Sequence, residues 1–316
     1  MRKALIVGID YYTNVSPLYG CVNDAYSVKS VLERNVNGTI NFSINLITST
    51  GSDSTITRKQ LKDSVQELFN DDCEVALFYF AGHGYIESTG GFLITSECEE
   101  GDDGFSLNEL LTIVNNSKSR NKIIILDSCH SGISGTNISD SNALLSEGLT
   151  ILTASSAEQY ASEKNGSGVF TTLFIDALNG GAANLLGDIT PGSVYAHIDQ
   201  SLGPWEQRPI FKTNVKNFIS LRSVNPPISL SELRMLTELF RNIEDEFDLD
   251  PSFEPESENP IEENIKKFRV LQSFNRVNLV VPVGEEHMYF AAMNCKSCKL
   301  TPLGMHYWNL VKKERI

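Results

Sequence analysis

Five short apolar runs, separated by amphipathic segments, constrain the fold of this 316-residue chain more than any other feature. The runs are rich in β-branched residues, as buried strands are. They lie at residues 3–9, 42–47, 74–80, 122–126 and 149–154. The segments between them repeat apolar residues with the period of a helix, at 22–35, 58–69 and 107–114. This alternation predicts an α/β fold with a mainly parallel sheet and helices on both faces.

Further elements complete the predicted domain. Two more helices are expected at about 168–179 and 191–201, and a last strand at 217–221 brings the core strands to six. Ser106 and Glu109 have the spacing of a capping box at the start of the third helix.

The charge pattern divides the chain into three predicted regions. Residues 1–224 form the α/β domain. Residues 225–263 contain a helix over 229–242 and an acidic linker, because 244–263 carries ten acidic residues and no Lys or Arg. Residues 264–316 carry nine Lys or Arg against three acidic residues, a net of +6 (9 − 3). This reversal predicts a separate basic C-terminal module, a small α+β unit.

Composition excludes several classes of protein. A net charge of −14 argues against nucleic-acid binding by the whole surface and favours basic partners. No apolar run approaches the roughly 18 residues needed to span a membrane, and six scattered cysteines do not make a disulfide scaffold. We therefore expect a cytoplasmic protein with no membrane partner. Cys295 and Cys298 have the spacing of half a zinc site, but a closed site needs four ligands, so no metal site is predicted.

A histidine and a cysteine follow two neighbouring apolar runs. His83 comes shortly after the run 74–80, and Cys129 shortly after the run 122–126. Because ligands bind beyond the carboxyl ends of the strands in α/β sheets, we expect the two side chains to face each other there. A thiol beside an imidazole can become a thiolate nucleophile. Gly82 and Gly84 flank the histidine, and they would let the backbone turn and bring N–H groups to an oxyanion.

The motifs around these two residues resemble those of a known family. "FAGHGY" and "LDSCHSG" stand in this order, with His83 and Cys129 46 residues apart. They resemble the caspase-like cysteine peptidases, in the branch of the metacaspases and bacterial orthocaspases. "ALIVGIDYY", "GCVNDA", "LTASSAEQYASE" and "QRPIF" extend the resemblance over about residues 1–222. The resemblance implies the caspase-haemoglobinase type of sheet.

The resemblance also assigns catalytic roles. Cys129 would be the nucleophile, and His83 would act first as the general base and then as the general acid. The N–H groups of Gly84 and Cys129 would form the oxyanion hole. The chain is thus expected to be a cysteine endopeptidase.

The same resemblance predicts the substrate. Asp24 and Asp127 match the floor of an acidic S1 pocket, with Cys21 nearby, and Ser155 and Ser156 match the edge that pairs with an extended peptide. Two carboxylates would select Arg or Lys at the P1 position through charge-assisted hydrogen bonds. The expected partner is a protein substrate with a basic P1 residue.

Two features of the sequence bear on the cofactor and on activation. Many metacaspases need calcium, but here Asp102 and Asp103 stand before "SLNEL", where the family has its acidic pair. No cofactor is therefore predicted, and calcium dependence is left as a question. Residues 130–163 contain no Lys or Arg, so an enzyme specific for basic residues cannot cut itself there, and Lys164 is the first basic site beyond. Activation by a regulatory protein or ligand at the C-terminal module is expected, in a bacterial stress or defence role.

Two alternatives remain at this point. The chain could be a catalytically silent caspase-fold scaffold or a DNA-binding regulator, because residues 295–316 loosely resemble the last strand pair and helix of a winged-helix domain and the module is basic. Alternatively, the enzyme could cleave after aspartate, in which case Asp140 becomes a maturation site.

Overall fold

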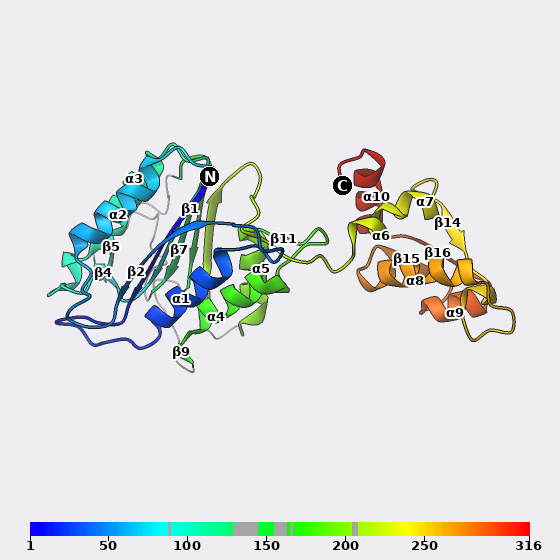
Figure 1. Cartoon of the computed structure of the whole chain (residues 1–316), viewed down its shortest axis with the longest axis horizontal. Coiled ribbons are helices and arrows are strands. Elements are labelled where there is room, and N and C mark those ends of the chain that lie inside the picture. The colour runs from blue at the N-terminus through cyan, green and yellow to red at the C-terminus, as the bar shows by residue number, and fades with distance from the viewer. Residues whose placement is uncertain (88–89, 129–144, 155–162, 165–166, 204–207) are drawn as a thin grey trace. The chain divides into compact units, whose positions relative to one another are not determined.

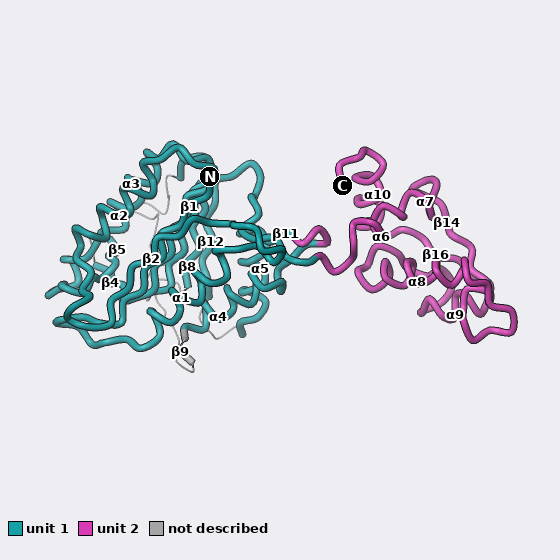
Figure 2. Tube along the Cα trace, in the orientation of Figure 1, with its two compact units in different colours: residues 1–184, 188–225 teal, residues 185–187, 226–316 magenta. Residues whose placement is uncertain are grey.

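The computed structural model describes residues 1–87, 90–128, 145–154, 163–164, 167–203 and 208–316. The chain forms two compact units (Figure 2). The first comprises residues 1–184 and 188–225, and the second comprises residues 185–187 and 226–316.

A six-stranded sheet forms the centre of the first unit (Figure 1). Its strands are β1 (Arg2–Ile9), β2 (Ser43–Ser49), β3 (Val75–Ala81), β7 (Asn121–Asp127), β8 (Leu149–Thr153) and β12 (Ile210–Asn214). They lie in the order β12-β8-β7-β3-β1-β2, and only β12 is antiparallel to its neighbour. The predicted mainly parallel sheet of six strands is confirmed.

The sixth strand is not the predicted one. The sequence predicts it at 217–221, whereas the structure places it at Ile210–Asn214. β12 is an edge strand whose residues are half-buried or exposed, so it lacks the apolar run that marks the inner strands. The apolar residues of 217–221 serve as packing in an irregular segment, where Leu221 is buried and Phe218 is 40% exposed.

Helices cover both faces of the sheet, as predicted (Figure 1). One layer contains α1 (Cys21–Leu32), α4 (Val169–Asp176) and α5 (Pro191–Ser201), and the other contains α2 (Arg58–Asn70) and α3 (Leu107–Asn115). Alternate strand residues feed the two cores: Ile6 of β1 packs with the first layer, and Leu5 and Val7 with the second. The sheet is therefore buried on both sides, as its continuous apolar strands require.

Short elements link these layers. They are β4 (Gly84–Glu87), β5 (Gly90–Leu93), the 3-10 turn η1 (Gly101–Asp103), β6 (Phe105–Ser106), β9 (Glu163–Lys164), β10 (Ser167–Gly168), the π-turn η3 (Ala177–Gly181), β11 (Asp188–Ile189) and β13 (Arg222–Ser223). β4, β5 and β6 form a small antiparallel sheet directly after β3.

The predicted capping box of α3 is wrong. Ser106 is the N-cap residue, but its side chain makes no capping hydrogen bond. Glu109 instead accepts an ion pair from Lys62 Nζ at 2.6 Å and lies 3.5 Å from Arg58 on α2. The hydrogen bond from Lys62 lowers the pKa of the Glu109 carboxyl. Charges on a neighbouring helix have taken the side chain that the local pattern assigned to the cap.

The second unit combines helices with a three-stranded antiparallel sheet, an α+β arrangement. Its elements are α6 (Leu230–Arg234), α7 (Leu236–Leu239), β14 (Glu246–Asp248), the 3-10 turn η4 (Pro251–Phe253), α8 (Glu262–Arg276), β15 (Val280–Val283), α9 (Met288–Met293), β16 (Ser297–Leu300) and α10 (Pro302–Lys312). The sheet order is β14-β16-β15. Trp308 of α10 donates a hydrogen bond to the carbonyl of Phe240 at 2.7 Å within the core of this unit.

Three expectations for this region are corrected. The acidic segment 244–263 is not a linker, because β14 pairs with β16 and both Leu249 and Phe253 are buried in the core. The predicted helix 229–242 is two short helices, α6 and α7. Residues 295–316 are expected to contain a strand pair and a helix, but they contain one strand, β16, followed by α10. The strands β14 and β15, which pair with β16, lie earlier in the chain. Within the described part of the chain, no helix is long and apolar enough to cross a membrane.

Candidate active site

The two central strands bring the predicted site to one edge of the sheet. β3 and β7 are parallel, and Ala81 lies opposite Asp127 at their carboxyl ends. His83 follows Ala81 by two residues, and Cys129 follows Asp127 by the same number. Cys129 itself lies outside the described residues, so its contact with His83 remains a prediction.

Two groups from the segment after β1 hold His83. The imidazole Nε2 lies 2.8 Å from the carbonyl oxygen of Ser16, and the backbone N–H donates to the hydroxyl of Tyr12 at 2.8 Å. Because a carbonyl oxygen only accepts hydrogen bonds, Nε2 carries the proton in this contact. In the neutral ring this leaves Nδ1 free to accept a proton.

Tyr12 is buried against the histidine. Its hydroxyl donates to the carbonyl of Ile9 at 3.2 Å, and its ring centroid lies 4.8 Å from that of His83. Burial raises the pKa of the Tyr12 phenol well above its usual value. The neutral phenol can therefore both donate to Ile9 and accept from His83.

Gly82 makes room for this contact. A Cβ at position 82 would lie 2.8 Å from the Tyr12 hydroxyl oxygen and 2.9 Å from the ring of Phe80. Neither Gly82 nor Gly84 has a positive φ angle, so neither position needs glycine for a left-handed conformation. The chain bends at Gly82, as predicted, whereas Gly84 lies in β4. Gly82 is required by close approach, and Gly84 simply begins β4 opposite Leu93. The role of Gly84 in the oxyanion hole remains a prediction.

The two predicted pocket carboxylates come together at the start of α4. Asp24, in the first turn of α1, is 3% exposed and accepts a hydrogen bond from the Gly168 N–H at 2.9 Å. Asp127 is 7% exposed and accepts from the Thr171 hydroxyl at 2.6 Å. A Cβ at Gly168 would lie 2.6 Å from Asp127 Oδ2 and 3.3 Å from Asp24 Oδ2. One glycine therefore lies beside both carboxylates.

A buried tyrosine lies behind this pair. The Tyr79 hydroxyl of β3 is 2.6 Å from Thr171 Oγ1. Thr171 has one hydroxyl proton and donates it to Asp127, so Tyr79 must be the donor to Thr171. Burial, followed by the charges of Asp127 and Asp24, raises the pKa of Tyr79 well above its usual value. The phenol remains protonated and can act as this donor.

Sequence reasoning missed four of these residues: Tyr12, Tyr79, Gly168 and Thr171. Tyr12 stands within the quoted stretch "ALIVGIDYY", and Tyr79 within the apolar run of β3, where it reads as core. No local pattern indicates that Thr171 contacts Asp127, because the two lie 44 positions apart.

The remaining predicted site residues divide into two groups. Cys21 is buried at the start of α1, close enough to Tyr12 and Tyr79 to add to their raised pKa values. Ser155 and Ser156 lie outside the described residues, so their pairing with a peptide remains a prediction.

In the part of the chain that the structure describes, no three His, Cys, Asp or Glu side chains could hold one ion together. Asp102 and Asp103 lie in η1. Cys295 is an exposed free thiol, whereas Cys298 is buried in β16, and burial raises the pKa of its thiol to about 12.

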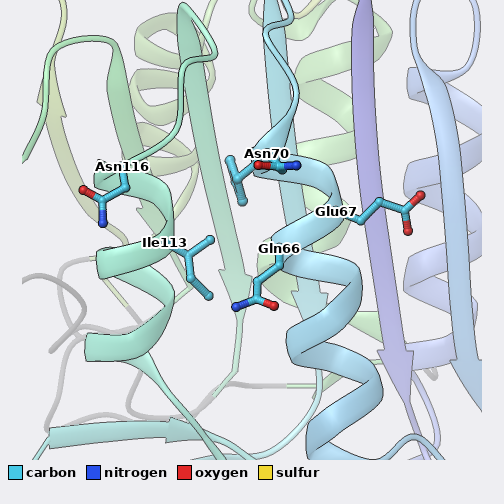
Figure 3. A pocket seen from close by; sticks show the side chains of 6 residues that line it. Gln66, Glu67, Asn70, Ile113 and Asn116 are labelled. Carbon is cyan, nitrogen blue, oxygen red and sulfur yellow. The ribbon is translucent and has the colours of Figure 1, made fainter.

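A groove between α2 and α3 is separate from the site (Figure 3). Gln66, Glu67, Asn70, Ile113 and Asn116 line it together with Phe69, and the carboxylate of Glu67 points away from Asn116. These residues precede the amino ends of β3 and β7, whereas His83 follows the carboxyl end of β3. The groove therefore lies at the end of the sheet that is remote from the predicted chemistry.

The sheet topology and the histidine at its carboxyl edge are those of a caspase-like α/β domain. The family model of the caspase domain matches residues 1–302. The chain therefore belongs to the caspase domain family. The matching family model is that of a cysteine peptidase, a class of enzyme that acts on protein substrates. The match extends beyond the first unit into the second.

Two solved structures are similar to this chain. The chain is similar to protein GSU0716 from Geobacter sulfurreducens, with a TM-score of 0.52, 14% identity, and coverage of 71% of this chain and 100% of that chain. It is also similar to caspase-1 from Spodoptera frugiperda, with a TM-score of 0.49, 13% identity, and coverage of 71% and 91%. At 14% identity, the similarity to GSU0716 supports the fold alone. No curated protein matches the chain in sequence.

Proposed function

We propose that the protein is a cysteine endopeptidase that cleaves after Arg or Lys by means of a Cys129–His83 dyad. The Cys129 thiol proton passes to Nδ1 of His83, and the thiolate forms a bond to the substrate carbonyl carbon. The carbonyl oxygen becomes an oxyanion, which the N–H groups of Gly84 and Cys129 would stabilise. The imidazolium then gives its proton to the leaving amine as the peptide C–N bond breaks. Water then attacks the acyl carbon, with His83 again as the base, and the bond between that carbon and the Cys129 sulfur breaks.

The orientation of His83 supports this scheme. Its Nε2 is engaged by the Ser16 carbonyl, so Nδ1 is the nitrogen that remains to take a proton. The dyad supplies both the nucleophile and the acid, so the proposed chemistry requires no cofactor.

The convergence of Asp24 and Asp127 carries the substrate preference. Both carboxylates are buried beside Gly168, near the edge of the sheet from which His83 emerges. A guanidinium or ammonium group can offset two adjacent carboxylates through charge-assisted hydrogen bonds, whereas an aspartate side chain would be repelled. A basic P1 residue is therefore the side chain that suits the pair.

Control by a partner completes the proposal. Residues 130–163 contain no Lys or Arg, so the enzyme has no basic site for self-cleavage between Cys129 and Lys164. A regulatory protein or ligand at the second unit would then activate it, in the cytoplasm and in a defence role.

Fluorogenic peptides ending in Arg, Lys or Asp provide the test. Wild type, Cys129→Ala and Asp127→Asn are compared with and without calcium. Cleavage after Arg and Lys is expected, with complete loss in Cys129→Ala and a higher KM in Asp127→Asn. Cleavage after Asp alone would overturn the pocket assignment. Silence of the wild type on every peptide, together with no labelling of Cys129 by iodoacetamide, would favour a catalytically silent scaffold.

A further inference from the structure

We infer that the start of α4 sets the specificity of the pocket, with Thr171 as the specificity-determining positioning residue and Tyr79 behind it. This inference rests on the proposed function, because it concerns how the two carboxylates are held for a basic P1 side chain. It assigns roles to residues outside the Cys–His dyad and outside the carboxylate pair itself.

The hydrogen bond from Thr171 to Asp127 is unusual for a helical threonine. Threonine in a helix commonly donates to the carbonyl four residues earlier, and its neighbour Thr172 does this with the Gly168 carbonyl at 3.0 Å. Thr171 is fully buried and donates instead to Asp127 Oδ2 at 2.6 Å, in the range of charge-assisted O–H···O⁻ bonds. Its hydroxyl therefore fixes the rotation of the Asp127 carboxylate.

Tyr79 fixes the direction of that hydroxyl. Its own O–H lies 2.6 Å from Thr171 Oγ1, and the residue is completely buried on β3. Because Tyr79 donates to one lone pair of Thr171, the hydroxyl proton of Thr171 is directed to Asp127. Tyr79 on the sheet thus donates a hydrogen bond to Thr171, and Thr171 donates one to Asp127 in the pocket.

Gly168 holds the other carboxylate from the same helix end. Its N–H donates to Asp24 Oδ2 at 2.9 Å, and any Cβ there would approach Asp127 Oδ2 to 2.6 Å. A single backbone position, three residues before Thr171, therefore spaces the two carboxylates. A small displacement of the start of α4 would alter both at once.

The experiment compares Thr171→Val with Thr172→Val, a matched control that removes a hydroxyl bonded only within the helix among the described contacts. We expect Thr171→Val to raise KM for Arg peptides about tenfold to a hundredfold, as loss of a hydrogen bond to a charged group implies, with little change in kcat. The inhibition constant of benzamidine, a basic aromatic probe, should rise by the same factor. Tyr79→Phe should give a smaller rise in the same direction, and Thr172→Val should match the wild type.

A structural role alone would give a different result. The rate at which iodoacetamide labels Cys129 should not change in Thr171→Val, because Thr171 contacts the carboxylate and not the histidine. Equal KM and benzamidine values in Thr171→Val and Thr172→Val would overturn the inference, as would parallel losses of kcat and labelling rate. If Thr171→Val does not fold, Tyr79→Phe decides by the same two constants. A wild type that cleaves only after Asp and does not bind benzamidine would instead refute the proposed function.

Discussion

Removal of a single oxygen atom at position 12 tests how the histidine is held. Tyr12→Phe keeps the ring that lies 4.8 Å from the imidazole but deletes the hydroxyl, which accepts from the His83 N–H at 2.8 Å and donates to the Ile9 carbonyl at 3.2 Å. Two hydrogen bonds are lost, one from the His83 N–H and one to the Ile9 carbonyl. The change therefore separates hydrogen bonding from packing.

The expected cost can be set from burial. A fully buried donor that loses its partner costs about 1–3 kcal/mol. The His83 N–H bond is only partly buried, so water recovers part of this cost, and we expect the free energy of unfolding to fall by about 1 kcal/mol. Because the backbone N–H of His83 loses its partner, the imidazole is positioned less accurately, and kcat should fall about tenfold, as about 1.4 kcal/mol in the barrier implies. KM should not change, since Tyr12 does not touch the carboxylate pair.

The assay pairs urea unfolding with peptide hydrolysis for Tyr12→Phe and for Tyr11→Phe. Tyr11 is the adjacent, half-buried tyrosine, and among the described contacts its hydroxyl makes no hydrogen bond, so it serves as the control. The pH dependence of Cys129 labelling by iodoacetamide reports thiolate formation independently of substrate. If Tyr12→Phe and Tyr11→Phe give the same unfolding free energy and the same kcat, the hydroxyl does not position His83. A rise in KM alone would assign it to the pocket instead.

Three further outcomes follow from other parts of the chain. Burial raises the pKa of Tyr12 and of Tyr79, so the folded state keeps both protons above about pH 10 while the unfolded state loses them. The unfolded state then binds fewer protons, and urea unfolding should show stability falling as pH rises beyond 10, less steeply in Tyr79→Phe. Trp308→Phe removes the hydrogen bond to the Phe240 carbonyl and should destabilise the second unit by about 1 kcal/mol, measured by urea unfolding of the full chain. Incubation of active enzyme should leave residues 130–163 uncut in the intact mass, and a cut after aspartate there would contradict the basic specificity.

The inner part of the fold is predictable from the sequence because strong local signals coincide with it. Each of the five strands predicted from an apolar run begins and ends within two residues of that run. Four of them, β8, β7, β3 and β1, lie inside the sheet, where a strand buried on both faces needs continuous apolar residues. The edge strand β12 has no such signal, because solvent covers one of its sides and polar residues such as Lys212 and Thr213 are tolerated. The sequence therefore predicts the sixth strand at 217–221, where apolar residues pack without forming a strand.

Local rules also fail where a distant residue competes for a side chain. Glu109 has the spacing of a capping residue, but its carboxylate forms an ion pair with Lys62 on α2 instead. The acidic stretch 244–263 resembles a solvated linker by composition, yet β14 pairs with β16, and Leu249 and Phe253 are buried in a core. Composition averages over a segment, whereas packing depends on single positions.

The candidate site shows the same division. Motifs mark His83, Asp24 and Asp127, and the structure places the two carboxylates beside one glycine, whereas the roles of the three residues in catalysis and substrate binding stay predictions. The groups that hold them are not predictable, since Tyr12 reaches His83 across 71 positions and Thr171 reaches Asp127 across 44. A tyrosine in a strand and a threonine in a helix carry no local indication of such contacts.

The register of the two central strands has a consequence for how this architecture tolerates change. Ala81 stands opposite Asp127, and the side chains of the proposed dyad each follow at a distance of two residues. An inserted residue in either two-residue step would move one side chain of the proposed dyad out of line with the other, because the parallel register holds Ala81 and Asp127 opposite each other. No such requirement fixes the number of residues in the connections that leave this edge, which include the small sheet β4-β5-β6. These connections can therefore vary in length, whereas the two-residue steps from Ala81 to His83 and from Asp127 to Cys129 cannot.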